Sequence, residues 1–197
     1  MELTQTGESG SYTFGTLKAF SAGIFADVVV TENLSIQPGL YYTIKGLKLD
    51  EVVLDFEFEP GFTGSLQTKI DNKITYVELP VHFLYNGNIN AGKFFLGAGP
   101  FAAAAISAKN KGKVFSSATM GGNTITDTQD VDEKVEIGKE DGIKRFDYGA
   151  TALAGFRFNS GFLLSAGYDY GLANIYFGND GSVTKTRTFT VSAGFSF

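Results

Sequence analysis

The chain has 197 residues, a formal net charge of −5 and 19% charged residues, against roughly 25% in an ordinary soluble domain. Its 25 glycines are nearly twice the usual share of about 7%, and 19 phenylalanines accompany them, whereas cysteine is absent. These numbers indicate a single domain over residues 1–197, and they exclude a disulfide framework, thiol chemistry, a disordered chain and a basic surface for nucleic acid.

The amino terminus reads Met-Glu-Leu-Thr-Gln and lacks the basic and apolar regions of a signal peptide. Two interpretations follow: a cytosolic protein, or a mature or truncated segment that carries a start methionine. No run of 18 apolar residues occurs, so we expect no transmembrane helix. The pattern of the remaining chain has to decide between the two interpretations.

Apolar side chains recur with period two over most of the chain, and this period is typical of β-strands. We predict seven strands, over residues 20–28, 34–45, 77–85, 94–103, 148–158, 162–171 and 188–197. One face of each strand carries Phe, Tyr, Leu, Val and Ala, and the other face carries Gly, Ser, Thr and a few charges. None of these segments has a convincing helical alternative.

The connections between these strands alternate in length. Short segments rich in turn-forming residues lie at 31–33, 86–92 and 159–161. Long polar segments lie at 46–73, 108–144 and 174–184. Short turns on one side and long loops on the other are typical of an outer-membrane barrel.

The short turns also predict how neighbouring strands are paired. A register that follows them places Asp27 opposite Gln37 and Thr151 opposite Asp169, polar against polar. Opposite residues of an antiparallel hairpin share a face, so a wrong register would mix the polar and apolar sets. The predicted pairing is therefore consistent with one polar and one apolar face.

The bulky face is expected to meet lipid, and the face of small residues to line the inside of a narrow barrel. The bulky face carries almost no charge within the 9–11 residues that a spanning strand needs, with Arg187 as the exception near the start of its strand. Aromatic residues gather at strand ends, as in the interfacial girdles of such barrels: Tyr42, Tyr85, Phe94, Tyr148, Phe156, Phe158, Phe162, Tyr168, Tyr170, Phe195 and Phe197.

The predicted fold is therefore all-β, a closed antiparallel up-and-down transmembrane β-barrel. Backbone groups in lipid must all be paired, so strands can span a membrane only as a closed barrel. Single-chain bacterial barrels have an even number of strands, and we expect eight, of which seven are clear. The eighth is either the weak stretch at residues 1–6 or a first strand removed together with a signal peptide.

Several polar side chains point into the predicted lumen by the parity of their positions. We predict that they form a polar network, made of Asp27, Gln37, Lys45, Glu78, His82, Arg157 and Asp169. His82 is the single histidine, lies about 13 Å along the strand from Glu78, and is expected opposite Gly97, which leaves room for its ring. A buried proton-responsive site is the alternative, but a satisfied network that fills the lumen is favoured, so we expect no open pore.

The long polar segments suggest two further features. Residues 55–59 alternate between acidic and aromatic side chains, which indicates strands that continue beyond the membrane as a protruding hairpin. Segment 108–144 is acidic and could offer oxygens to a hard cation such as Ca²⁺ through Asp127, Asp130, Asp132, Glu133, Glu136, Glu140 and Asp141. It lacks EF-hand spacing, so we interpret these as solvated loop charges and expect no metal and no cofactor.

Four stretches carry a family pattern when taken in order. They are residues 33–42 (NLSIQPGLYY) with Lys45-Gly46, 76–81 (YVELPV), 97–101 (GAGPF), and 147–149 (DYG) with 155–156 (GF) and 168–175 (YDYGLANI). Together they resemble the Bacteroidetes outer-membrane β-barrel family that includes PorT-like proteins. The terminal Phe197, with Phe195 two residues before it, is similar to the carboxy-terminal aromatic signal read by the barrel-assembly machinery.

The resemblance covers residues 16–197 and implies an eight-stranded barrel in the cell outer membrane, with roles in envelope integrity or secretion. The main hypothesis is a non-enzymatic integral barrel whose lumen is filled by side chains and whose long extracellular loops form an interaction surface. Expected partners are outer-membrane lipid, the barrel-assembly machinery and an extracellular or secretion-system protein, and not nucleic acid.

Two alternatives stay open. One is a soluble lipocalin-like barrel that binds a small apolar ligand. The other is a small outer-membrane enzyme that modifies lipid, which would need a histidine with a serine and an acid near the lipid-facing rim. The single histidine points inward, and neither a G-x-S-x-G motif nor a phosphate-binding loop occurs.

Overall fold

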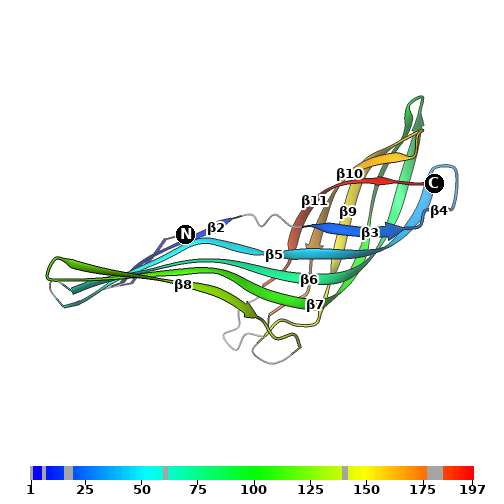
Figure 1. Ribbon diagram of the computed structural model, residues 1–197. Coiled ribbons are helices and arrows are strands. Elements are labelled where there is room, and N and C mark those ends of the chain that lie inside the picture. Colours follow the sequence, from blue (N-terminus) through cyan, green and yellow to red (C-terminus); the bar gives the residue numbers. More distant parts are fainter. Residues whose placement is uncertain (1, 6–7, 16–19, 60–61, 139–141, 177–183) are drawn as a thin grey trace. The chain divides into compact units, whose positions relative to one another are not determined.

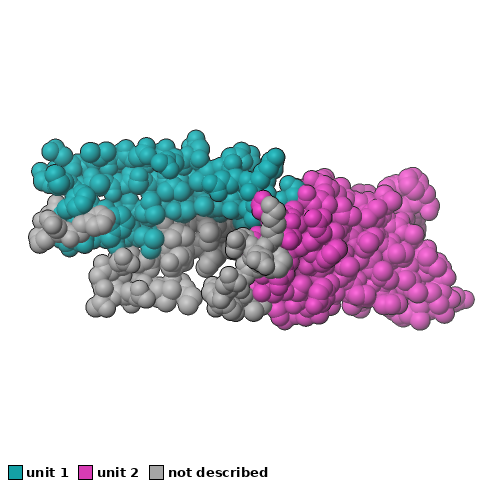
Figure 2. Space-filling view, turned by 90° about the horizontal axis from the view of Figure 1, so that it is seen from below, with its two compact units in different colours: residues 1–19, 45–74, 107–135 teal, residues 20–44, 75–106, 136–197 magenta. Residues whose placement is uncertain are grey.

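A computed structural model describes residues 2–5, 8–15, 20–59, 62–138, 142–176 and 184–197. Its eleven described strands belong to one hydrogen-bonded sheet (Figure 1). The chain forms two compact units (Figure 2): unit 1 is residues 1–19, 45–74 and 107–135, and unit 2 is residues 20–44, 75–106 and 136–197. Within the described residues, no helix is long and apolar enough to cross a membrane.

The strands follow one another along the chain with few other elements between them. They are β1 (Glu2–Gln5), β2 (Glu8–Gly15), β3 (Ser21–Phe25), β4 (Val28–Val29), β5 (Leu34–Glu59), β6 (Phe62–Ile89), β7 (Gly92–Met120), β8 (Asn123–Lys134), β9 (Phe146–Phe158), β10 (Phe162–Gly171) and β11 (Arg187–Phe195). Strands β5, β6 and β7 contribute to both units.

Unit 2 contains a strongly curled antiparallel sheet in the order β3 and β4, β5, β6, β7, β9, β10, β11 (Figure 1). The registers predicted from the short turns are confirmed where β3 and β4 pair with β5 and where β9 pairs with β10. Thr151 lies opposite Asp169, as expected. The β9–β10 turn closes at Gly161, whose φ of 89° lies in the left-handed region that favours glycine.

The two faces of this sheet have the orientation predicted from their composition. Along β10, for example, Leu164, Ala166 and Tyr168 are exposed on the convex side, whereas Leu163 is buried on the concave side. The same alternation holds along β9 and β7. Bulky side chains therefore cover the outside and small or polar ones line the inside.

The sheet of unit 2 has two edges, β3 and β11. Neighbouring strands alternate in direction, so the first and the seventh run the same way, and an antiparallel closure needs one more strand between them. Outward side chains on the edges are the most exposed, with Ile24 at 73% and Val191 at 74%, against 59% for Leu96 on the inner strand β7. No pairing joins β3 to β11 in the described part of the chain, so closure with eight strands stays a prediction.

The stretch considered for the eighth strand has a different described partner. Residues 2–5 do form a strand, β1, but it pairs with β2 in unit 1. Residues 1 and 6 lie outside the described part of the chain. Strand β2 in turn pairs with the second half of β5, with a register shift between Thr13 and Phe14.

Unit 1 contains the long hairpins that extend β5, β6 and β7. The prediction of continued strands around residues 55–59 is confirmed, because β5 runs to Glu59 and β6 begins at Phe62. The prediction of a polar loop from residue 108 was wrong over most of its length. Strand β7 continues to Met120 and pairs with β8 over twelve consecutive positions. These pairs join threonines and opposite charges, which stabilise a hairpin but show no apolar period in the sequence.

A small core lies inside unit 2. Tyr76, Phe101, Ile143 and Ile175 are buried there, and the Ile143 backbone bonds to Glu136. Near them, the hydroxyl of Thr186 donates to the buried carboxylate of Asp147 over 2.7 Å.

Candidate lumen site

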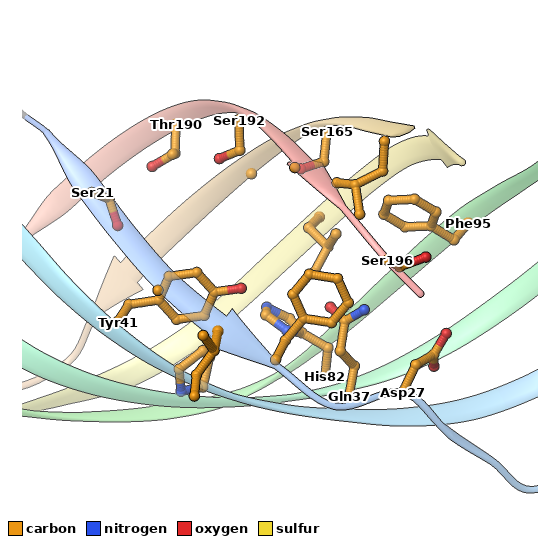
Figure 3. A pocket seen from close by; sticks show the side chains of 18 of the residues that line it. Ser21, Asp27, Gln37, Tyr41, His82, Phe95, Ser165, Thr190, Ser192 and Ser196 are labelled. Atoms are coloured by element: carbon orange, nitrogen blue, oxygen red, sulfur yellow. The ribbon is translucent and has the colours of Figure 1, made fainter. Parts of the chain in front are cut away.

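A hollow of about 660 Å³ lies on the concave face of the sheet in unit 2 (Figure 3). Residues from β3, β5, β6, β7, β9, β10 and β11 line it. Six residues of the predicted polar network are among them: Asp27, Gln37, Glu78, His82, Arg157 and Asp169. No pairing joins β3 to β11 among the described residues, so the expectation that side chains fill the lumen of a closed barrel stays a prediction.

Lys45 is the one predicted network residue that does not line this hollow. It is 2% exposed and belongs to unit 1. Parity along β5 had placed it on the inner face, and its burial agrees with that face. A role for these seven residues as a functional network stays a prediction.

An ion pair spans the hollow between strands that are not neighbours in the sheet. The Arg157 guanidinium on β9 donates from Nη2 to Asp27 Oδ2 over 2.8 Å, and the two side chains are only 20% and 18% exposed. Asp27 follows β3, which is separated from β9 by three strands in the sheet order. The pair therefore stabilises the curl of the sheet as well as neutralising both charges.

Removing one partner of this pair should leave the other charge poorly solvated. We expect Arg157→Gln to lower the free energy of unfolding by about 1.5–3 kcal/mol, the range for hydrogen bonds to charged groups. Urea unfolding in detergent micelles measures this loss. Combining Arg157→Gln with Asp27→Asn should cost less than the sum of the two single changes. Additive losses would show that the pair does not couple the two strands.

His82 contacts Thr151, and the glycine beside it differs from the one predicted from the sequence. Its Nε2 lies 3.4 Å from Thr151 Oγ1, so β6 reaches β9 across the intervening strand β7. Gly99 is paired with Thr151, and a Cβ built on Gly99 would lie 3.1 Å from His82 Cα. Gly99, and not Gly97, is thus the glycine beside His82, because the β6–β7 register is shifted by two residues from the expected one.

Several hydroxyl-bearing residues of the hollow were missed as site residues. Ser165 on β10 and Thr190 and Ser192 on β11 line it together (Figure 3). Tyr41 lies across from them on β5. The alternation did place all four on the face of small and polar residues. Their neutral hydroxyl groups were interpreted as side chains that fill the lumen and not as part of a binding site.

The aromatic features are placed at the ends of the strands. Phe158 stacks on Phe162 beside the β9–β10 turn, with ring centroids 5.9 Å apart. At the opposite ends of β10 and β11, the Arg187 guanidinium lies 3.6 Å from the centre of the Tyr170 ring and donates to the Gly171 carbonyl. The one charge expected on the bulky face therefore has a cation–π partner and a carbonyl at a strand end.

The predicted assembly signal lies at an exposed end of the sheet. Phe195 and Phe197 are exposed, and their rings meet edge to face at 5.4 Å. Recognition of this pair by assembly machinery stays a prediction.

Among the residues that the structure describes, the acidic side chains of segment 108–144 do not form a cluster. Asp127, Asp130, Asp132 and Glu133 are spread along β8, and Glu140 and Asp141 lie outside the described residues. Among the side chains that the structure describes, no group of three or more His, Asp or Glu is arranged to hold a metal ion.

The comparison with protein families finds a match. The sequence model of the family described as outer membrane protein β-barrel domain matches residues 6–176. The matched range includes every strand from β2 to β10. No curated protein and no solved structure matches the chain.

Proposed function

The chain belongs to the outer membrane protein β-barrel domain family, and from this premise we propose that it is a non-enzymatic membrane anchor that displays its long hairpins as an interaction surface. Its place is the cell outer membrane. The spanning part is the curled sheet of unit 2. The displayed part is the β5–β6 and β7–β8 hairpins of unit 1.

The observation that carries this proposal is the apolar outer face of unit 2. Exposed leucine, isoleucine, valine and aromatic side chains cover the outside of its strands, among them Leu40, Leu79, Phe83, Leu96, Leu164, Phe189 and Val191. Exposed apolar area on this scale in water would drive aggregation. In a bilayer it meets hydrocarbon, which requires no polar partner.

The soluble lipocalin-like alternative was wrong. Such a barrel turns its apolar face inward and its charged face outward, whereas the arrangement here is the opposite. Family membership places the chain in the outer membrane.

A lipid-modifying activity has less support than the anchoring role. His82 is 7% exposed on the concave face, and its ring faces Thr151 rather than the lipid side. A lipid-modifying centre of the type considered above needs its histidine at the lipid-facing rim. The geometry of His82 supports a non-enzymatic protein.

We further propose a relation to the PorT-like proteins, with a role in envelope integrity or secretion. The four ordered stretches described above support it, together with Phe195 and Phe197. In unit 2, two of these stretches lie on neighbouring strands of the sheet, since Phe101 pairs with Gly149.

The topology can be tested by labelling, because the chain has no cysteine of its own. Asn123→Cys places a thiol at the tip of the β7–β8 hairpin, and Ser160→Cys places one in the short β9–β10 turn; both positions are exposed. In intact cells, a membrane-impermeant maleimide should label Cys at 123 and should label Cys at 160 only after lysis, since long connections and short turns lie on opposite sides. Equal labelling of both, or the reverse order, would contradict the proposal.

A further inference from the structure

Strand β8 is an edge strand of unusual length. It has 12 residues, pairs only with β7 in the described part of the chain, and at roughly 3.3 Å per residue is about 40 Å long. Natural edge strands are protected by charged side chains, proline, bulges or short length, and β8 has only the first of these. Strand β8 has no proline, no positive-φ residue and no register shift over its twelve pairs with β7.

The turn before β8 determines which backbone groups face the open edge. Gly121 and Gly122 form a two-residue hairpin turn with φ of 58° and 83°, so Met120 and Asn123 are a hydrogen-bonded pair. Hydrogen bonding to β7 then falls on odd-numbered residues. The bond from the Val135 amide to the Ala108 carbonyl, one step beyond the strand, follows the same parity.

The free edge is therefore presented by the even-numbered residues. Their N–H and C=O groups point away from β7, and their side chains share one face: Thr124, Thr126, Thr128, Asp130, Asp132 and Lys134. The 2.9 Å contact between the hydroxyls of Thr119 and Thr124 agrees with this parity, since side chains approach most closely in non-hydrogen-bonded pairs.

The charge of β8 restricts what can pair with it. It has four carboxylates, Asp127, Asp130, Asp132 and Glu133, against the single cation Lys134. Lys111 and Lys113 on β7 contact Asp132 and Asp130 at 2.9 and 3.4 Å. The hydrogen bond from Lys111 holds the pKa of Asp132 below its ordinary value, so this carboxylate stays ionised near neutral pH.

We propose that the free edge of β8 binds an extended, basic segment of a partner protein by strand addition. Main-chain hydrogen bonds from the even-numbered residues supply affinity, and lysine or arginine side chains beside the carboxylates select the partner. A second copy of β8 is a poorer occupant, because pairing two acidic strands places like charges near each other. The inference rests on the proposed function, since it names the partner chemistry of the displayed hairpins.

The test uses the full chain in detergent micelles and a synthetic ten-residue peptide that alternates lysine and threonine. Thr128→Pro removes one N–H from the free edge and leaves the charge and the β7 ladder unchanged, whereas Thr128→Ala keeps that N–H. We expect Thr128→Pro to weaken peptide binding at least tenfold and Thr128→Ala to bind like the parent. A peptide that alternates glutamate and threonine should not bind.

Other outcomes would overturn the inference. Equal binding by the parent and Thr128→Pro would mean attraction by charge alone, without strand addition. Self-association of the chain that Thr128→Pro abolishes, without peptide binding, would make a second copy the occupant. Protection of the Gln129 and Val131 amides from hydrogen exchange in Thr128→Pro checks that the hairpin is intact. If the Asn123→Cys variant is labelled in intact cells but the protein does not bind the peptide, only this inference is overturned. If the Asn123→Cys variant is not labelled in intact cells, the proposed function is overturned.

Discussion

Ala152→Arg is expected to lower the free energy of unfolding in a lipid bilayer by about 2–4 kcal/mol, which is the cost of a cation at the midplane of a barrel's lipid face. Ala152 is exposed in the middle of β9, where it pairs with Ala98 on β7 and with Tyr168 on β10. All three side chains are on the convex face. The guanidinium would have no polar partner in the hydrocarbon there.

The position on the sheet, and not the added bulk, should cause this loss. Ala98→Arg should behave in the same way, because it lies on the same face one strand away. Ser192→Arg is the matched control, since Ser192 lines the hollow and its arginine would face polar groups. Urea-driven unfolding from phospholipid vesicles measures all three variants. If both alanine variants were as stable as the parent and Ser192→Arg were not, the assignment of the two faces would be reversed.

Gly97→Trp should prevent folding of the curled sheet. A Cβ built at Gly97 already collides with the Phe83 carbonyl oxygen and lies 2.5 Å from the Leu84 side chain. Inserting extra groups into a packed interior costs roughly 1–3 kcal/mol when the surroundings can shift, and here the colliding atom belongs to the backbone of the neighbouring strand. An indole would therefore separate β6 from β7.

Two alanine substitutions separate this close approach from the general effect of changing a glycine. A Cβ at Gly99 would collide with the Val81 carbonyl, whereas at Gly167 the nearest atom, the Ala152 carbonyl oxygen, is 3.4 Å away. Gly99→Ala should therefore lose stability and Gly167→Ala should retain it. Heat-dependent mobility of the folded protein on gels provides a rapid comparison. Equal stability of Gly99→Ala and Gly167→Ala would contradict the close approach of β6 and β7.

The alternation of side chains was sufficient to predict the strands of unit 2 and the direction of their faces, although the single strand expected over residues 20–28 is divided into β3 and β4. Period two is a property of the extended backbone itself, so it can be read without knowing the neighbours. Short turns then determined the register, as the pairing of Thr151 with Asp169 shows. Wherever a turn is short and one face is apolar, a slip by one residue would expose the wrong face.

Two predictions were wrong because the alternation of side chains does not determine them: the β6–β7 register and the absence of a β7–β8 hairpin. The β6–β7 register moved by two residues, a shift that keeps every side chain on its face and leaves the alternation unchanged, so Gly99 rather than Gly97 lies beside His82. The β7–β8 hairpin was missed because its pairs are formed by threonines and charges, which carry no apolar period.

What the sequence determined by itself is therefore the class of the fold and the side of each strand that meets lipid, because both follow from alternation along a single extended chain. The tertiary structure decided which polar residues meet. Arg157 reaches Asp27, and His82 reaches Thr151, across intervening strands. Both contacts arise because the sheet curls, and the contact of His82 also requires the space that Gly99 on β7 leaves above the backbone. Curl and clearance are properties of several strands packed together, so no single strand encodes them.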